Sequence, residues 1–255
     1  MTSGDVPAVQ IRELSTLEEC GSVDPLFEAV WGPSSPPIGV EILRALAHSG
    51  GYVAGAFYQG SLVGACVGFV THKNEESLHS HTTGVTAAAR GLGVGSALKE
   101  HQRNWALARG IKTITWTFDP LVRRNAWFNI TKLGALPRDY LVDFYGPMPD
   151  DINRADESDR LHMEWVLEGR PAPSAFDAAS LPKILACEEE APASRTSTAD
   201  HVLVATPPEI EELRHRRPDL ARMWRLALRA TLMSEMERGQ VVGFTQAGEY
   251  VIGRG

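Results

Sequence analysis

The stretch AAARGLGVGSALKEHQR (87–103) has glycines at every second position from 91 to 95, and no other feature constrains the fold as strongly. The preceding residues 77–86, SLHSHTTGVT, have a composition typical of a strand. Residues 95–110 have helical spacing and end at Gly110. Glycines between a strand and a helix can direct consecutive N–H groups into one concavity, at the positive end of the helix dipole. The stretch therefore predicts either an anion-binding turn or a plain strand-to-helix reversal.

Two nucleotide-binding motifs do not fit the spacing. A dinucleotide fingerprint requires a glycine where Ser96 stands, and a P-loop requires a Gly-Lys pair that the stretch lacks. A pyrophosphate remains compatible, with Arg90 and the Ser96 hydroxyl at the rim of the turn.

Charge and cysteine content narrow the class of protein. The chain has 255 residues and a net charge of −7, so no strong positive field is available for nucleic acid or an anionic membrane. The three cysteines, Cys20, Cys66 and Cys187, lie far apart without a CxxC pair, which favours neither disulfides nor zinc. The N-terminal residues do not resemble a signal peptide, and no apolar run is long enough to cross a bilayer, so we expect a cytoplasmic protein.

Hydrophobic periodicity predicts a mixed α/β fold rather than a strict alternation of strands and helices. We expect strands at 9–14, 77–86, 111–120, 139–146, 160–167 and 201–206, and hairpins at 51–72 and 240–253. We expect helices at 16–32, 39–50, 95–110 and 123–135, and one or two helices over 208–239. Residues 169–200 are rich in Ala, Pro and Ser and are interpreted as a linker or covering segment.

Two motifs resemble those of the GNAT (GCN5-related) N-acyltransferase superfamily. VTAAARGLGVGSAL resembles its acyl-CoA motif at Arg90, Gly93 and Gly95, and NAWFNITKLGA is similar to its second motif at Asn125, Leu133 and Gly134. The similarity covers about residues 9–168 and points to a branch with a C-terminal extension. It implies a central mixed sheet with splayed fourth and fifth strands, flanked by helices. The implied domains are 1–168 for the acyltransferase, 169–200 for the linker and 201–255 for a small α/β extension.

The resemblance implies an acyl-CoA-dependent N-acyltransferase that moves an acetyl or succinyl group from a CoA thioester to a small amine, for example an amino acid. No metal is implied, and a homodimer is compatible with the sequence. The implied CoA-binding residues are Thr83, Gly84, Val85, Arg90, Gly91, Gly93, Val94, Gly95, Ser96 and Asn125. The alternatives are a non-catalytic acyl-CoA-binding module and an acetyltransferase acting on proteins.

The catalytic candidates are His81, Asp119 and Asn129. Alternation places His79, His81 and Thr83 on one strand face, and His81 is the first choice of base; an ordinary in-sheet histidine and a metal site with His72 are the alternatives. Asp119 is either catalytic or shapes the Asp-Pro turn. Asn125 and Asn129 are expected on one helix face, with Asn129 either functional or an ordinary surface residue. Gly84 indicates a bulge or a close backbone approach.

Three further expectations concern other polar groups. Ile130 stands where many members of the superfamily place a tyrosine that acts as general acid for the thiolate, so either another donor such as Tyr140 or Tyr145 replaces it or the thiolate leaves without a donor. Arg222, Arg225 and Arg229 share a helix face and predict either a carboxylate site or a solvated surface. Lys99 and Arg103 are expected to meet CoA phosphates or solvent.

Overall fold

A computed structural model describes residues 9–32, 38–72, 76–146, 148, 156–169 and 177–255. The chain divides into two compact units, residues 1–115 and 116–255, and the boundary falls within strand β5. Among the described residues, no helix combines the length and apolar character needed to cross a membrane.

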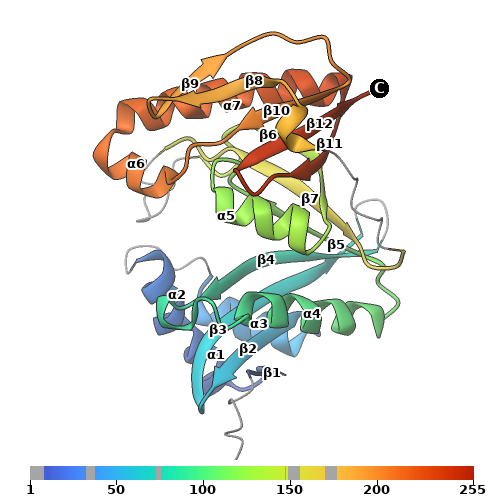
Figure 1. Cartoon of the computed structure of the whole chain (residues 1–255). Helices are drawn as coiled ribbons and strands as arrows, with labels where there is room; N and C mark the ends of the chain where they lie inside the picture. Colours follow the sequence, from blue (N-terminus) through green and yellow to red (C-terminus); the bar gives the residue numbers. More distant parts are fainter. Residues whose placement is uncertain (1–8, 33–37, 73–75, 147, 149–155, 170–176) are drawn as a thin grey trace, which may run out of the picture. The chain divides into compact units, whose positions relative to one another are not determined.

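The first unit is a mostly antiparallel sheet with helices on both faces (Figure 1). Its strands are β1 (Gln10–Glu13), β2 (Tyr52–Tyr58), β3 (Ser61–Thr71), β4 (Ser77–Val85) and the beginning of β5 (Thr113–Phe118), hydrogen-bonded in that order. Its helices are α1 (Leu17–Gly21), α2 (Val23–Trp31), α3 (Val40–His48), η1 (Ala87–Ala89) and α4 (Val94–Leu107). The expected helix 16–32 is therefore two helices.

The two faces of this sheet carry different side chains. Val53, Ala65 and Val67 belong to an apolar cluster that includes Leu26 and Phe27 of α2. On the opposite face, Lys99 of α4 donates to Ser80 of β4. The alternation of strand residues thus separates an apolar layer from a partly polar one.

Within the described part of the first unit, β4 and β5 form the only parallel pair of strands. The register consists of Leu78 opposite Ile114 and His79 opposite Thr115, whereas β4 continues to Val85. This short register fits the expected divergence of the fourth and fifth strands.

The second unit contains the rest of β5, two further strands of the same sheet, and a separate five-stranded sheet. In hydrogen-bonded order β5 is followed by β7 (Arg160–Val166) and β6 (Leu136–Leu141), after the short helix α5 (Arg123–Ala126) and the π-helical segment η2 (Trp127–Lys132). The other sheet has the order β11 (Gly239–Phe244), β12 (Glu249–Arg254), β10 (His201–Ala205), β8 (Lys183–Glu188) and β9 (Ala191–Ser194). The remaining helices are η3 (Ala178–Ser180), α6 (Ile210–Arg216) and α7 (Pro218–Arg238), and α7 packs along this sheet (Figure 1).

Two expectations about the second unit need correction. Residues 170–176 of the expected linker lie outside the described residues, but β8 and β9 lie within 169–200, where Ile184, Leu185 and Ala186 are buried. β6 begins at Leu136, three positions earlier than expected, because its register shifts beside Pro137 and so accommodates a residue without an N–H.

Candidate active site

The glycine turn leaves the N-terminus of α4 open to solvent. Gly91 and Gly93 have φ of 85° and 76°, a region in which residues with a Cβ are strained. Gly93 is the N-cap of α4, and no described side chain forms a capping hydrogen bond there. Arg90, Gly91, Gly93 and Ser96 are exposed, whereas Val94 is buried. The exposed backbone N–H groups and the helix dipole therefore suit an anionic ligand.

A β-bulge interrupts β4 at His81. Ser80 lies opposite Gly68 and Thr82 lies opposite Val67, which leaves His81 as the extra residue. The bulge reverses the alternation, so Thr83 shares a face with Ser80: Cys66 Sγ lies 3.1 Å from Thr83 Oγ1 and 3.9 Å from Ser80 Oγ. The expectation that Thr83 faces the same way as His81 is wrong for this reason.

His79 and His81 do lie together, but in different surroundings. Their ring centroids are 6.3 Å apart, and both rings lie near Phe69. His79 is bonded within the unit, with Nδ1 3.3 Å from Thr115 Oγ1, whereas His81 is exposed. Within the described ranges, no group of three His, Cys, Asp or Glu side chains is arranged to hold a metal.

Gly84 lies at a close approach to aromatic side chains rather than at the β-bulge, which falls at His81. A Cβ at Gly84 would lie 2.8 Å from the Trp31 ring and 3.3 Å from Phe27. The approaching group is the aromatic pair of α2, whose rings meet edge to face at 5.1 Å. Gly84 and Val85 continue β4 opposite Ala65 and Gly64.

Lys99 lies on the inner face of α4 rather than at the surface. It is 4% exposed and donates to Ser80 Oγ at 2.7 Å and to Gln102 Oε1 at 3.1 Å. Burial lowers the pKa of its ammonium. Lys99 therefore meets neither solvent nor a phosphate, and we infer that its bond to Ser80 helps to fix the bulge. Arg103 pairs with Glu100.

In the second unit, the π-helical turn separates the two asparagines. Asn125 is exposed on α5, whereas Asn129 is 5% exposed on η2. A π-helix has more residues per turn than an α-helix, so positions four apart no longer share a face. Asn129 is therefore not the ordinary surface residue that was one alternative. Ile130 is also buried.

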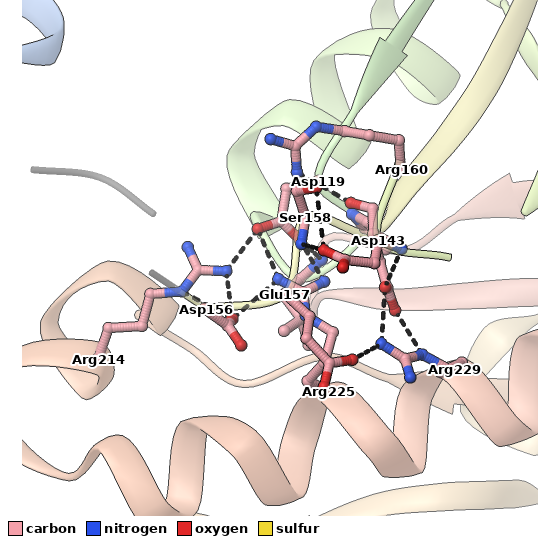
Figure 2. A network of polar contacts seen from close by, with 12 residues as sticks. Asp119, Asp143, Asp156, Glu157, Ser158, Arg160, Arg214, Arg225 and Arg229 are labelled. Carbon is pink, nitrogen blue, oxygen red and sulfur yellow. Dashed lines mark hydrogen bonds and ion pairs between the residues drawn. The ribbon is translucent and has the colours of Figure 1, made fainter. Parts of the chain in front are cut away.

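Asp119, at the end of β5, is the centre of a buried ion-pair network (Figure 2). Its Oδ1 and Oδ2 each lie 2.9 Å from Arg225, and Oδ2 also accepts from Arg214 at 2.5 Å. Burial raises the pKa of Asp119, but Arg225 and Arg214 outweigh that effect and lower it far below its ordinary value. Such a carboxylate has little affinity for a proton, which argues against a role as base.

The same carboxylate also shapes the Asp-Pro turn. Asp119 Oδ1 accepts the N–H of Leu121 at 3.0 Å, and Pro120 O accepts from Tyr250 at 2.7 Å. This is the structural alternative considered for Asp119.

The arginines of α7 do not form a free carboxylate site. Arg225 binds Asp119 and, at 3.0 Å, Asp156. Arg229 binds Asp159 at 2.7 and 2.8 Å and also binds Glu157 (Figure 2). Arg222 is 70% exposed and lies 3.9 Å from Glu157. Arg225 and Arg229 thus pair with carboxylates of the protein itself. The spacing of the arginines along α7 does not reveal this pairing, because the carboxylates lie elsewhere in the sequence.

Tyr140 and Tyr145, the two tyrosines that could replace Ile130 as proton donor, differ in burial and in hydrogen-bond partners. Tyr140 donates to Asp159 at 2.6 Å, and burial and this carboxylate raise the pKa of its hydroxyl. Tyr145 is 44% exposed, and its hydroxyl lies 3.1 Å from Thr117 Oγ1 of β5. Tyr145 is therefore the more available proton donor.

Comparison with known proteins defines the class. Residues 20–134 match the family model described as the acetyltransferase (GNAT) family. This stretch contains both the glycine turn and the α5 motif, so the class is that of CoA-thioester-dependent acetyltransferases. Residues 20–134 therefore form a domain of the GNAT acetyltransferase family, and this domain is that of an enzyme of the N-acyltransferase class. No curated protein sequence gives a significant match.

Solved structures have the same fold at low sequence identity. The ribosomal-protein-S18-alanine N-acetyltransferase from Escherichia coli is 14% identical, with a TM-score of 0.51 over 66% of this chain and 99% of that one. Arabidopsis thaliana Naa50, in complex with the bisubstrate analogue CoA-Ac-MVNAL, is 17% identical, with a TM-score of 0.51 over 62% of this chain and 97% of that one.

Proposed function

We propose that the protein transfers an acetyl or succinyl group from a CoA thioester to the amine of a small metabolite, for example an amino acid. The observation that carries this proposal is the glycine turn of a GNAT domain with an open, uncapped helix N-terminus behind it. An acidic protein needs such a local site to hold an anionic cosubstrate.

The CoA moiety would be held by two groups of residues. Arg90 and the backbone of Gly91, Gly93 and Gly95, with Ser96, would bind the pyrophosphate. The backbone from Thr83 to Val85 and the Asn125 side chain would bind the pantetheine arm and polarise the thioester carbonyl. The exposure of Arg90, Ser96 and Asn125 supports these assignments.

The reaction forms a C–N bond and breaks a C–S bond. A neutral amine attacks the thioester carbonyl and loses a proton, and the departing thiolate gains one. His81, directly or through water, is the proposed acceptor of the amine proton, because it is an exposed histidine at the bulge. Tyr145 is the proposed donor to the thiolate, although an unassisted thiolate with a pKa near 8.5 can also leave.

Two alternatives use the same fold differently. The first alternative is a non-catalytic module that binds CoA without turnover. It is supported by Ile130, a buried side chain that cannot donate a proton to the thiolate. A protein N-terminus is the other candidate acceptor, since one structural relative is named as a ribosomal-protein-S18-alanine N-acetyltransferase and the other is in complex with the bisubstrate analogue CoA-Ac-MVNAL. Their likeness to this chain concerns the fold, so the acceptor must be found by experiment.

Thiol release distinguishes these functions. Acetyl-CoA and succinyl-CoA are each incubated with free amino acids, small polyamines and short peptides with free N-termini. The proposal expects turnover with a small amine. Turnover with peptides alone would favour the protein acceptor, and tight CoA binding without turnover on any amine would favour the non-catalytic module.

A further inference from the structure

The second unit contains a pocket that the acyl-transfer proposal does not use. Its volume is about 370 Å³, and it lies between the beginning of α5, the start of α6 and the turn that joins β11 to β12. The lining residues that bear on its chemistry are Arg123, Trp127, Glu209, Ile210, Phe244 and Gln246.

Arg123, on the α5 side of the pocket, uses only part of its hydrogen-bonding capacity within the protein. Arg123 Nε lies 3.2 Å from Thr206 Oγ1, and Nη2 donates to Thr206 O at 2.5 Å. These two bonds hold the guanidinium in place. Its third nitrogen, Nη1, has no bond to any described residue, so a carboxylate can approach a fixed donor there.

One anionic group on the α6 side is also available. Glu209 is exposed and lines the pocket, and its carboxylate attracts the guanidinium of Arg123 electrostatically without a direct ion pair among the described residues. The neighbouring charges, Arg124 and Glu211, pair with each other through two N–O contacts and so cancel. The pocket is left with one positive and one negative group to offer a ligand.

The remaining walls combine apolar surface with the polar side chains of Thr245 and Gln246. Trp127, Ile210 and Phe244 supply aromatic and aliphatic surface, and the indole face of Trp127 also favours a nearby cation. We propose that this pocket binds a small zwitterion with an apolar side chain, such as a free α-amino acid. Arg123 binds the carboxylate, Glu209 binds the ammonium, and the apolar wall receives the side chain.

This inference goes beyond the proposed function because it needs only residues of the second unit. It is tested by titration calorimetry of the full chain without any CoA compound, so its failure leaves the acyl-transfer proposal untouched. The probes are L-leucine, 4-methylpentanoate, which lacks the ammonium group, and 3-methylbutylamine, which lacks the carboxylate.

We expect L-leucine to bind and each single-charge analogue to bind at least about tenfold more weakly, since each leaves one charged group of the pocket without its partner. Glu209→Gln is expected to weaken L-leucine binding by about tenfold and to strengthen 4-methylpentanoate binding, because the variant lacks the carboxylate that this analogue leaves without a partner. Glu212→Gln is the matched control, because Glu212 is exposed on the same helix, pairs with Arg216 and does not line the pocket. The proposal is overturned if L-leucine does not bind, if Glu209→Gln binds it as tightly as the native chain, or if the amine binds as tightly as L-leucine.

Discussion

His81 illustrates how a single extra residue can create a reactive position. The bulge leaves His81 without a partner residue on β3, and its side chain is exposed rather than bonded into the sheet as His79 is. Bulges commonly redirect a side chain beside an active site. The proposed role of His81 as base therefore depends on the bulge, and so on Ser80 and the buried Lys99 that binds it.

His81→Ala is expected to lower kcat/KM by about 100-fold at neutral pH, because general base catalysis typically contributes this much. Steady-state thiol release at several pH values from 6 to 9 measures the effect. The control is His72→Ala, an exposed histidine just after β3, which should retain native activity. Full activity of His81→Ala across this range would show that His81 is not the base.

Sequence could identify these residues but not their orientation. Gly93 and Gly84 are recognisable because a left-handed turn and a close aromatic approach each require glycine. The direction of Thr83 depends on the bulge, and strand alternation alone assigns it to the wrong face. Lys99 was expected at the surface because lysine is rarely buried, although Leu98, Gln102 and Ala106 mark the inner side of its helix.

At the scale of elements, the ion-pair network connects the end of β5 to the helices of the C-terminal half. Asp119 of β5 binds Arg214 of α6 and Arg225 of α7 (Figure 2). Arg229 of α7 binds Asp159 just before β7. A buried ion pair adds little compared with an apolar one, but removal of one partner leaves an uncompensated charge. The network therefore makes these elements depend on one another.

Asp119→Asn is expected to lower the free energy of unfolding by about 3–5 kcal/mol at pH 7. The pKa of Asp119 is lower in the folded protein than in the unfolded chain, so its contribution is present above about pH 4 and declines as pH falls below that value. The difference between native and variant chains should therefore shrink on acidification. Urea unfolding at several pH values measures it.

The matched control is Glu188→Gln, whose partner Arg195 is about as exposed as Glu188 itself. Loss of this surface pair is expected to cost less than about 1 kcal/mol. Equal costs for Asp119→Asn and Glu188→Gln would contradict the view that the network is structurally important.

The sequence predicts the order of strands and helices better than it predicts irregular helical geometry or the strands of the C-terminal half. The order of strands and helices up to β7 follows from periodicity, because each amphipathic segment has one apolar face. The π-helical turn at Trp127–Lys132 and the strands β8 and β9 were not predicted. The π-helical turn coincides with the burial of Asn129 and Ile130. Strands β8 and β9 lie in an Ala/Pro/Ser-rich stretch whose composition is typical of linkers.

For the whole chain, the ion-pair network indicates that residues 116–255 fold as one unit. Contacts also group these residues together, although the sequence suggests a boundary near residue 168. A chain ending at residue 168 would keep Asp119 and Asp159 but lose Arg214, Arg225 and Arg229.

A chain truncated after residue 168 is therefore expected to be insoluble or to melt well below the full-length chain. Loss of one buried partner costs about 3–5 kcal/mol, a large part of the 5–15 kcal/mol of a typical domain. Size-exclusion chromatography and melting followed by circular dichroism provide the measurement. A monodisperse fragment that melts cooperatively at the full-length temperature would instead support a separable domain.

Calorimetric titration of CoA into the native chain, Gly93→Ala and Gly60→Ala shows whether the glycine turn binds the CoA moiety. Both glycines have positive φ, 76° and 81°, and a Cβ at either would meet nothing within 4 Å, so both substitutions should cost a similar 1–2 kcal/mol of stability. Gly60 lies in the turn between β2 and β3, away from the proposed CoA-binding residues in sequence. We predict that CoA binds the native chain and Gly60→Ala equally well and binds Gly93→Ala at least about tenfold more weakly, because the N-terminal N–H groups of α4 are then misplaced. Equal CoA affinity for all three chains, or no affinity for the native chain, would contradict the account.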